Sequence, residues 1–354
     1  MKTKLTAMIC AALMCAGILG SCGDGNTQDT SVKESEKAST SADISENSES
    51  DTPDSPVDDE SKSEDLDLTG EESGITPAMW KITGKNGAEV TFMGSMHALS
   101  EDDYPLPDEI TSALDNSDIL AVEADISQTA TINYQSALLA NMYYDDPDDS
   151  LDKHISAEAY EALEEYLATY DLPIDTVKLF KPWAANNTAE TLALQYCDLQ
   201  ADLGIDSYLI DKAKSKGKEV YEVEGIDFQM DILINNTDET FDALLKQYKG
   251  KTKDIMIDQL YKTHDAWRSG DIDTIDEMNS ETAEVGDEEG KLLEEYTTAF
   301  LDDRNIGMEK CAKDFIDGDK NVFFVVGAAH FAGEKGIISL LEKDGYKVER
   351  IAFE

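Results

Sequence analysis

Two of the four histidines in the 354-residue chain occur in the same short sequence context. His97 ends the phrase Gly-Ser-Met-His and His330 ends the phrase Gly-Ala-Ala-His, so both read G-x-x-H. Each phrase follows an apolar run, residues 90–93 and 322–326, that is typical of a buried strand. Imidazole is a common ligand of Zn, Mn, Co and Fe, and it is also a frequent acid or base in enzymes. We therefore expect two strand ends of one sheet to bring both rings to one metal ion or one substrate atom.

Two carboxylates and one guanidinium complete the candidate site. Glu123 ends the apolar run of residues 119–123, and Glu224 directly follows another predicted strand, residues 219–223. The carboxyl ends of strands in open α/β sheets face the crevice in which ligands bind. Arg304 lies in a helical stretch, from which it could hold a substrate carboxylate or orient Glu123. For each of these three residues, a plain ion pair or a solvated position is the alternative interpretation.

The other polar candidates are less specific. Asp206 and Tyr208 occur in the phrase Gly-Ile-Asp-Ser-Tyr and either support the site from behind or lie on an ordinary helix. His154 and His264 have polar helical surroundings, and we interpret both as structural. The chain has no H-E-x-x-H, G-x-S-x-G, P-loop or G-x-G-x-x-G motif. Conventional zincin, serine-hydrolase and nucleotide-binding mechanisms are therefore disfavoured.

The N-terminal segment is typical of a bacterial lipoprotein. Residues 1–21 combine two early lysines with an apolar stretch, as an export signal does. The sequence Leu-Gly-Ser before Cys22 reads as a lipobox, with Cys22 as the lipidated first residue of the mature chain; an ordinary signal peptide with a chance cysteine is the alternative. Residues 22–75 are rich in Ser, Asp and Glu and poor in large apolar residues, which predicts a disordered acidic tether. We expect an exported protein held at the cell membrane by the lipid on Cys22.

The charge of the chain restricts its partners. Of the formal net charge of −47, residues 23–75 contribute 17 acidic and 3 basic side chains, so most of the negative charge belongs to the folded part. So strong a negative field argues against nucleic acid and anionic lipid as partners. It is compatible with divalent cations or cationic peptides, and equally with simple solubility outside the cell.

The cysteines beyond the lipobox are two, Cys197 and Cys311. They are not spaced as C-x-x-C, which excludes a zinc ribbon. In an exported protein they form one disulfide or remain as two buried thiols, and the sequence leaves both alternatives open.

The pattern along residues 76–354 predicts one α/β domain with a central mixed sheet, β-α-β arms at both ends and a large helical insert. Residues 80–82 and 89–93 are expected to pair as a hairpin, because Asn-Gly lies between them. A helix from Pro107 to about residue 114 leads to the strand ending at Glu123. The other expected elements are helices from near residue 156 and over 184–200, 205–215, 238–268, 271–278, 288–317 and 333–343, and strands over 219–223, 322–326 and 346–351.

From about residue 80 to the C-terminus, the chain resembles the TraB/PrgY/GumN family, whose animal relatives are the Tiki Wnt-inactivating proteases. Each shared phrase is weak alone, but their order and spacing are specific. The phrases are Met-Gly-Ser-Met-His at 93–97, Tyr-Pro-Leu-Pro at 104–107, Ala-Val-Glu-Ala-Asp at 121–125, Gly-Ile-Asp at 204–206, Arg-Asn at 304–305 and Val-Gly-Ala-Ala-His-Phe-Ala-Gly-Glu-Lys-Gly at 326–336.

The resemblance implies a relationship to the erythromycin-esterase/ChaN-like superfamily and a metal-dependent peptidase centre. By analogy, His97 and His330 would be metal ligands, with Glu123 as a further ligand or general base. Ala329 departs from the family's common G-x-G-H pattern, which matters only if that position needs a positive φ.

These observations lead to one main hypothesis and two alternatives. The main hypothesis is a lipid-anchored hydrolase acting on a peptide or small exported substrate, with a divalent transition metal (Mn, Co or Zn) held by His97, His330 and Glu123. In it, Glu123 or Glu224 takes a proton from the attacking water, and Arg304 holds a carboxylate or stabilises the developing oxyanion. The first alternative is a non-catalytic surface protein that sequesters a small peptide, such as a pheromone. The second is metal-free acid–base hydrolysis of a small ester.

Overall fold

The computed structural model describes residues 2–4, 73–280, 282–284 and 287–353 of the chain. Most of the predicted export signal, the lipidation residue Cys22 and nearly all of the predicted tether lie outside these ranges and stay predictions. At the N-terminus, β1 (Lys2–Lys4) pairs antiparallel with β6 (Thr282–Glu284). Within the described ranges, no helix is both long and apolar enough to cross a membrane.

A six-stranded mixed sheet forms the centre of the domain, which confirms the predicted α/β class. The strands are β2 (Met79–Thr83), β3 (Glu89–Ser95), β4 (Ile119–Val122), β5 (Glu219–Glu222), β7 (Val322–Gly327) and β8 (Glu349–Arg350). Their order across the sheet is β5-β4-β7-β3-β2-β8. β3, β7, β4 and β5 run parallel, whereas β2 is antiparallel to both of its neighbours. The predicted hairpin is the β2–β3 pair.

The last long strand, β7, occupies the middle of the sheet. All six of its residues are buried, as expected for a parallel strand covered on both faces. Its register against β3 pairs Val90 with Val322 and, further along, Ser95 with Gly327. The two G-x-x-H phrases therefore leave adjacent strands at the same edge of the sheet.

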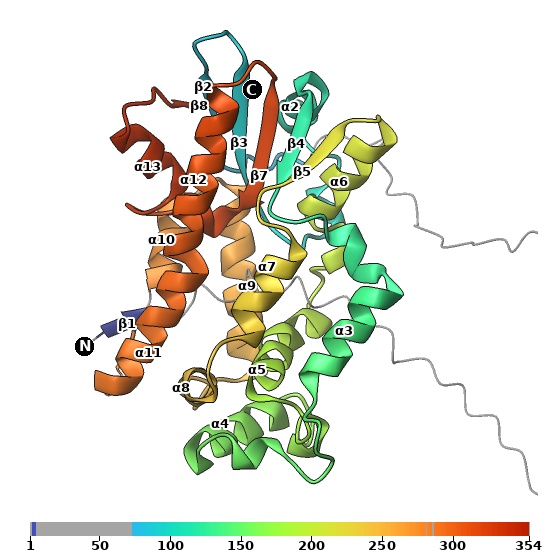
Figure 1. The fold of residues 1–354 in the computed structure, drawn as a ribbon, viewed down its shortest axis with the longest axis vertical. Helices are drawn as coiled ribbons and strands as arrows, with labels where there is room; N and C mark the ends of the chain where they lie inside the picture. Colours follow the sequence, from blue (N-terminus) through green and yellow to red (C-terminus); the bar gives the residue numbers. More distant parts are fainter. Residues whose placement is uncertain (1, 5–72, 281, 285–286, 354) are drawn as a thin grey trace, which may run out of the picture.

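Helices cover both faces of the sheet (Figure 1). α12 (Asp303–Ile316) and α13 (Ile337–Lys343) bury apolar residues against one face, where they share a cluster with Phe92 and Phe324. On the other face, α2 (Asp108–Asn116) and α6 (Ile205–Ser215) pack in the larger core cluster. The predicted bounds of α6 are confirmed, and α2 begins one residue later than expected, with Pro107 as its N-cap.

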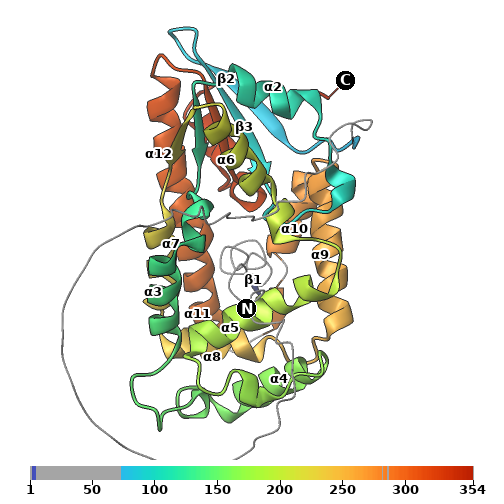
Figure 2. The same cartoon turned by 90° about the vertical axis from the view of Figure 1, so that its right-hand side faces the viewer.

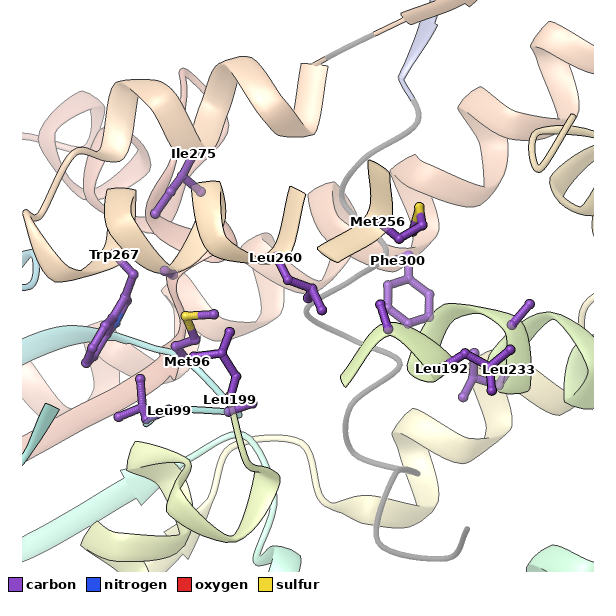
Figure 3. Packing of buried hydrophobic residues seen from close by; sticks show 14 of the residues in the cluster. Met96, Leu99, Leu192, Leu199, Leu233, Met256, Leu260, Trp267, Ile275 and Phe300 are labelled. Atoms are coloured by element: carbon purple, nitrogen blue, oxygen red, sulfur yellow. The ribbon is translucent and has the colours of Figure 1, made fainter. Parts of the chain in front are cut away.

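The helical insert lies beyond the carboxyl ends of the parallel strands (Figures 1 and 2). Its helices are α3 (Ile132–Met142), α4 (Ala157–Ala168), α5 (Pro182–Thr191), α7 (Ile226–Ile234), α8 (Asp238–Lys246), α9 (Lys253–Arg268), α10 (Ile272–Ser280) and α11 (Asp287–Thr297). Figure 3 shows how the insert packs beneath the first motif: Met96 and Leu99 face Leu260 and Trp267 of α9. The indole of Trp267 also donates a hydrogen bond to the carbonyl of Gly94 at 2.9 Å.

Two predicted helices of the insert are shorter in the structure. The stretch predicted over residues 184–200 is α5 followed by a 3-10 turn over Leu192–Tyr196. The stretch predicted over 238–268 is divided into α8 and α9, because the chain turns at Gly250 with a φ of +74°. Glycine adopts that conformation without steric cost, whereas a helix cannot continue through it. The two cysteines, Cys197 and Cys311, are free thiols rather than a disulfide.

Candidate functional site

The glycines of the two motifs allow the two strand ends to approach each other closely. A Cβ atom on Gly94 would lie 2.9 Å from the Cα and Cβ atoms of Ala328, closer than packed carbon atoms come. A Cβ atom on Gly327 would lie 3.0 Å from Oε1 of Glu123. The first glycine therefore makes room for the second motif, and the second glycine makes room for the carboxylate between the histidines. Close packing therefore explains why each G-x-x-H phrase begins with glycine.

The departure at Ala329 does not disturb the turn. After β7, the chain makes a 3-10 turn over Ala328–Phe331, and Ala329 is not among the residues with a positive φ. An alanine therefore adopts the backbone conformation of this position without strain.

Glu123 lies at the centre of a buried polar cluster at this edge of the sheet. Its Oε1 accepts the backbone N–H of Gly327 at 2.5 Å and lies 3.5 Å from Nε2 of His330. Its Oε2 accepts hydrogen bonds from Nη2 of Arg304 at 2.7 Å and from the Gln229 amide at 3.0 Å. Burial alone would raise the pKa of Glu123, but the positive charges of Arg304 and His97 and the Gly327 N–H hold it well below its usual range. Glu123 is therefore an ionised carboxylate in the interior.

Arg304 joins Glu123 to Glu224. Its guanidinium contacts Glu224 through both Nε (3.0 Å) and Nη2 (2.7 Å), and only 3% of its side chain is exposed. A π-helical turn over Thr298–Asp302 directly precedes α12, and Nη1 of Arg304 donates to the carbonyl of Phe300 in that turn. Burial raises the pKa of Glu224 above its usual range although Arg304 hydrogen-bonds to it. Because these contacts use three guanidinium nitrogens, Arg304 forms a buried ion pair with both carboxylates, and its role in orienting Glu123 stays a prediction.

His97 is held by Asp206 at the start of α6. Its Nδ1 lies 2.8 Å from Oδ2 of Asp206, and both side chains are more than nine-tenths buried. Gly204 makes the contact possible, because a Cβ atom there would lie 2.3 Å from the carbonyl oxygen of His97. Burial by itself lowers the pKa of His97, but the Asp206 carboxylate outweighs it and raises that pKa to about 9. His97 is therefore an imidazolium at neutral pH.

His330 is held in a different way, by an amide of α12. Its Nδ1 lies 2.6 Å from Oδ1 of Asn305, and the residue is 4% exposed. Burial lowers the pKa of His330 to about 3, and the contrary influence of Glu123 does not offset it. His330 is therefore a neutral imidazole, so the two motif histidines differ in charge.

The donor set does not complete a metal site in this arrangement. Each histidine has its Nδ1 held by a polar side chain, as metal-ligating histidines usually do. However, no three His, Cys, Asp or Glu side chains in the described part of the chain lie together as ligands of one ion. His330 and Glu123 supply two neighbouring donors, and Arg304 already engages the other oxygen of Glu123. The predicted Mn, Co or Zn ion therefore stays a prediction.

The structure brings the five predicted side chains, His97, His330, Glu123, Glu224 and Arg304, to one edge of the sheet. Asp206 supports His97 from behind, as considered from the sequence. The three other polar candidates have different neighbours: Tyr208 packs on Tyr104 with ring centroids 5.2 Å apart, His154 contacts Asp149 and Asp238, and His264 contacts Asp103.

Sequence reasoning missed Gln229 and the contribution of the Gly327 backbone. Gln229 is 6% exposed, and its amide nitrogen donates to both Glu123 and Glu224. Its position in the first turns of α7, five residues after Glu224, is the signal that would have placed it near the strand end. The contact of the Gly327 backbone N–H with Glu123 could not be predicted from the sequence, because side-chain types do not indicate which backbone N–H groups reach a site.

Comparison with known proteins gives the relationships of the chain. It is similar to a protein of Escherichia coli K12 named only as uncharacterized protein YbaP, with 29% identity over 157 residues, 44% of this chain and 56% of the relative. The Shigella flexneri protein of the same name is 30% identical over 146 residues, 41% of this chain and 52% of the relative. The aligned region thus spans about half the length of these relatives, and no solved structure matches the chain. The sequence model of the TraB/PrgY/gumN family matches residues 78–350, which includes the whole sheet and every residue of the site, and the chain belongs to this family.

Proposed function

We propose that the protein is a hydrolase of peptides or other small exported substrates. We place its active centre at the carboxyl ends of β3, β4 and β7, beside Glu123, His97 and His330. The observation that carries the proposal is the 3.5 Å contact between Nε2 of the neutral His330 and Oε1 of the ionised Glu123. Two unprotonated acceptors this close can both accept hydrogen bonds from one water and orient it for attack.

The charge difference between the two histidines supports an acid–base division of roles. Environments that push the pKa values of neighbouring groups apart are typical of paired catalytic acids and bases. In this proposal, Nε2 of His330 accepts the proton of the attacking water, the Glu123 carboxylate stabilises the imidazolium that forms, and the protonated His97 donates a proton to the leaving group. Arg304 and Asp206 are positioning residues, because they contact Glu123 and His97 rather than a substrate. The proton count balances, because one proton is taken from the attacking water and one is given to the leaving group.

The metal remains a separate question for experiment. If Mn, Co or Zn binds, the residues proposed to hold it are His97, His330 and Glu123, and the ion would polarise the scissile bond and lower the pKa of water. The steps assigned above use only side chains of this chain. Metal analysis of the wild type and of His97→Ala and His330→Ala variants decides between the two forms of the proposal.

We also propose that the protein is exported and anchored to the membrane through Cys22, which places its substrates outside the cytoplasm. The support is the predicted export signal of residues 1–21 and the lipobox before Cys22. Metabolic labelling with a fatty acid should mark the wild type and fail to mark Cys22→Ala. Labelling that persists in the variant would contradict this anchor.

The test of the hydrolase is cleavage of a library of short peptides and small esters by the purified chain, alone and with added Mn, Co or Zn. Glu123→Gln and His330→Ala should each lower kcat/KM by about 100-fold or more, as expected for loss of general acid–base catalysis. His154→Ala is the matched control, because its ring is held by two carboxylates in the helical insert.

A correctly folded wild type that cleaves nothing under any of these conditions would contradict the proposal. Full cleavage by Glu123→Gln would also contradict it. Peptide binding without cleavage, retained in His97→Ala and His330→Ala, would instead indicate a sequestering protein.

A further inference from the structure

The two motif histidines have different partners at the same ring atom. Nδ1 of His97 faces a carboxylate oxygen of Asp206 at 2.8 Å, whereas Nδ1 of His330 faces the amide oxygen of Asn305 at 2.6 Å. A carboxylate accepts hydrogen bonds through either oxygen. An amide accepts through its oxygen alone, so its orientation decides which histidine tautomer fits.

A backbone carbonyl fixes the orientation of the Asn305 amide. Its Nδ2 donates to the carbonyl oxygen of Lys335 at 3.0 Å. A carbonyl can only accept, so the NH2 end of the amide points to Lys335 and the oxygen must face His330. Asn305 is 1% exposed, and solvent therefore does not compete for either contact.

The distances then distinguish the tautomers of His330. With the proton on Nδ1, the 2.6 Å contact to Asn305 is a short hydrogen bond. With the proton on Nε2 alone, two acceptors would face each other at 2.6 Å, while the contact to Glu123 at 3.5 Å would gain only a long hydrogen bond. The shorter contact decides in favour of Nδ1.

We propose that Asn305 is a positioning residue that holds His330 in its Nδ1–H tautomer, so that a bare Nε2 faces Glu123 and receives an O–H or N–H donor. Glu123 already accepts the Gly327 N–H on the same Oε1. A donor such as the attacking water would therefore be accepted by both atoms. The catalytic meaning of this arrangement rests on the proposed hydrolase, but the tautomer itself does not.

The tautomer is measured directly by the nitrogen chemical shifts of the histidine rings. The full chain, with 15N-labelled histidine, is observed in long-range proton–nitrogen spectra at neutral pH, and His330→Gln assigns the signal. The wild type should show a protonated Nδ1 and a bare Nε2 at His330. Asn305→Leu should move the proton to Nε2, because no acceptor then faces Nδ1. Asn187→Leu, at a buried asparagine of α5, should leave the His330 signals unchanged.

Three results would overturn the inference: a wild type protonated on Nε2, a wild type protonated on both nitrogens, or an Asn305→Leu variant with the wild-type pattern. If Asn305→Leu does not fold, Asn305→Ala serves in its place, and the wild-type spectrum alone can still refute the idea. An inactive protein with the Nδ1–H tautomer would contradict the hydrolase and leave this inference standing. An active protein with the Nε2–H tautomer would contradict this inference and leave the proposed hydrolase standing. In an active protein, Asn305→Leu should lower kcat more than it changes KM, because the substrate-binding contacts remain.

Discussion

Gly94 and Ala328 belong to different G-x-x-H motifs, yet a single Cβ atom added to Gly94 would lie 2.9 Å from two carbon atoms of Ala328. The two strand ends are thus fitted to each other as well as to the carboxylate between them. We expect Gly94→Ala to lower the free energy of unfolding by about 1–3 kcal/mol, the usual cost of overpacking a core. Urea unfolding followed by circular dichroism measures the change.

Gly307 provides the control of opposite sign. It lies in α12 with an ordinary φ, and an added Cβ atom would meet nothing within 4 Å. Gly307→Ala should therefore stabilise the protein by about 0.5–1 kcal/mol, because alanine favours the helix. Equal effects of the two substitutions would show that the close contact at Gly94 does not matter.

Removing the Arg304 guanidinium should be among the most damaging substitutions at the site. Arg304→Met leaves Glu123 and Glu224 buried without their shared cation, and breaking a buried ion pair costs about 3–5 kcal/mol. Adding Glu123→Gln and Glu224→Gln to Arg304→Met should recover part of the loss, since no unpaired charge then remains. Chemical denaturation of the single and triple variants makes the comparison.

The matched control for Arg304 is Lys347→Met. Lys347 pairs with Glu349 in solvent, and its side chain is 88% exposed. Water screens an exposed ion pair of this kind, so this variant should unfold almost as the wild type does. A triple variant no more stable than Arg304→Met would show that the unpaired carboxylates are not the source of the loss.

The pairing of His97 with Asp206 predicts a loss of stability at alkaline pH. Because the pKa of His97 is raised from 6.5 to about 9, its contribution is fully present below pH 6.5 and is lost as the pH rises through 9. The difference between the two pKa values corresponds to about 3 kcal/mol. Asp206→Asn should remove this dependence, so its stability should change less than that of the wild type between pH 6.5 and 9.5. Parallel stability curves of the two proteins would contradict the assignment.

A second buried histidine pair should contribute to stability rather than to activity. Asp103 is fully buried, and its Oδ2 lies 2.7 Å from Nε2 of His264 in α9. His264→Ala should cost about 2–4 kcal/mol, because the buried carboxylate loses a hydrogen-bond donor. His154→Ala, at a more exposed ring between two carboxylates, should cost about 1 kcal/mol or less. Thermal unfolding of both variants tests the contrast, and equal losses would contradict it.

Much of the sheet was predictable because its strands are short apolar runs bounded by turn residues. The run at 322–326 predicted β7, and Asn-Gly at 86–87 predicted the β2–β3 hairpin. The position of β7 between β3 and β4 was not predictable, because strand order depends on contacts between residues more than 200 positions apart. Helix ends were harder to predict where a single glycine turns the chain, as Gly250 does between α8 and α9.

The candidate site was predictable in its residue types but not in its connections. Strand ends identified Glu123, His97 and His330, since their neighbours form apolar runs. The charge difference between the histidines could not be foreseen, because it depends on which side chains of α6 and α12 reach each ring. Gln229 was not predicted, because a polar residue in a helix has no periodic signal of its own.

The central position of β7 has a consequence for when the site can exist. The strand that supplies Gly327 and leads into the turn of His330 is the last long strand of the described chain, yet it must pair with strands formed from residues 89–95 and 119–122. Until residue 327 is available, β3 and β4 have no common neighbour and Glu123 lacks the backbone N–H beneath it. Sheets built from such distant pairings form slowly, because long loops must close first. The candidate site should therefore assemble late in folding. A chain that ends before β7 should have neither the complete sheet nor the site.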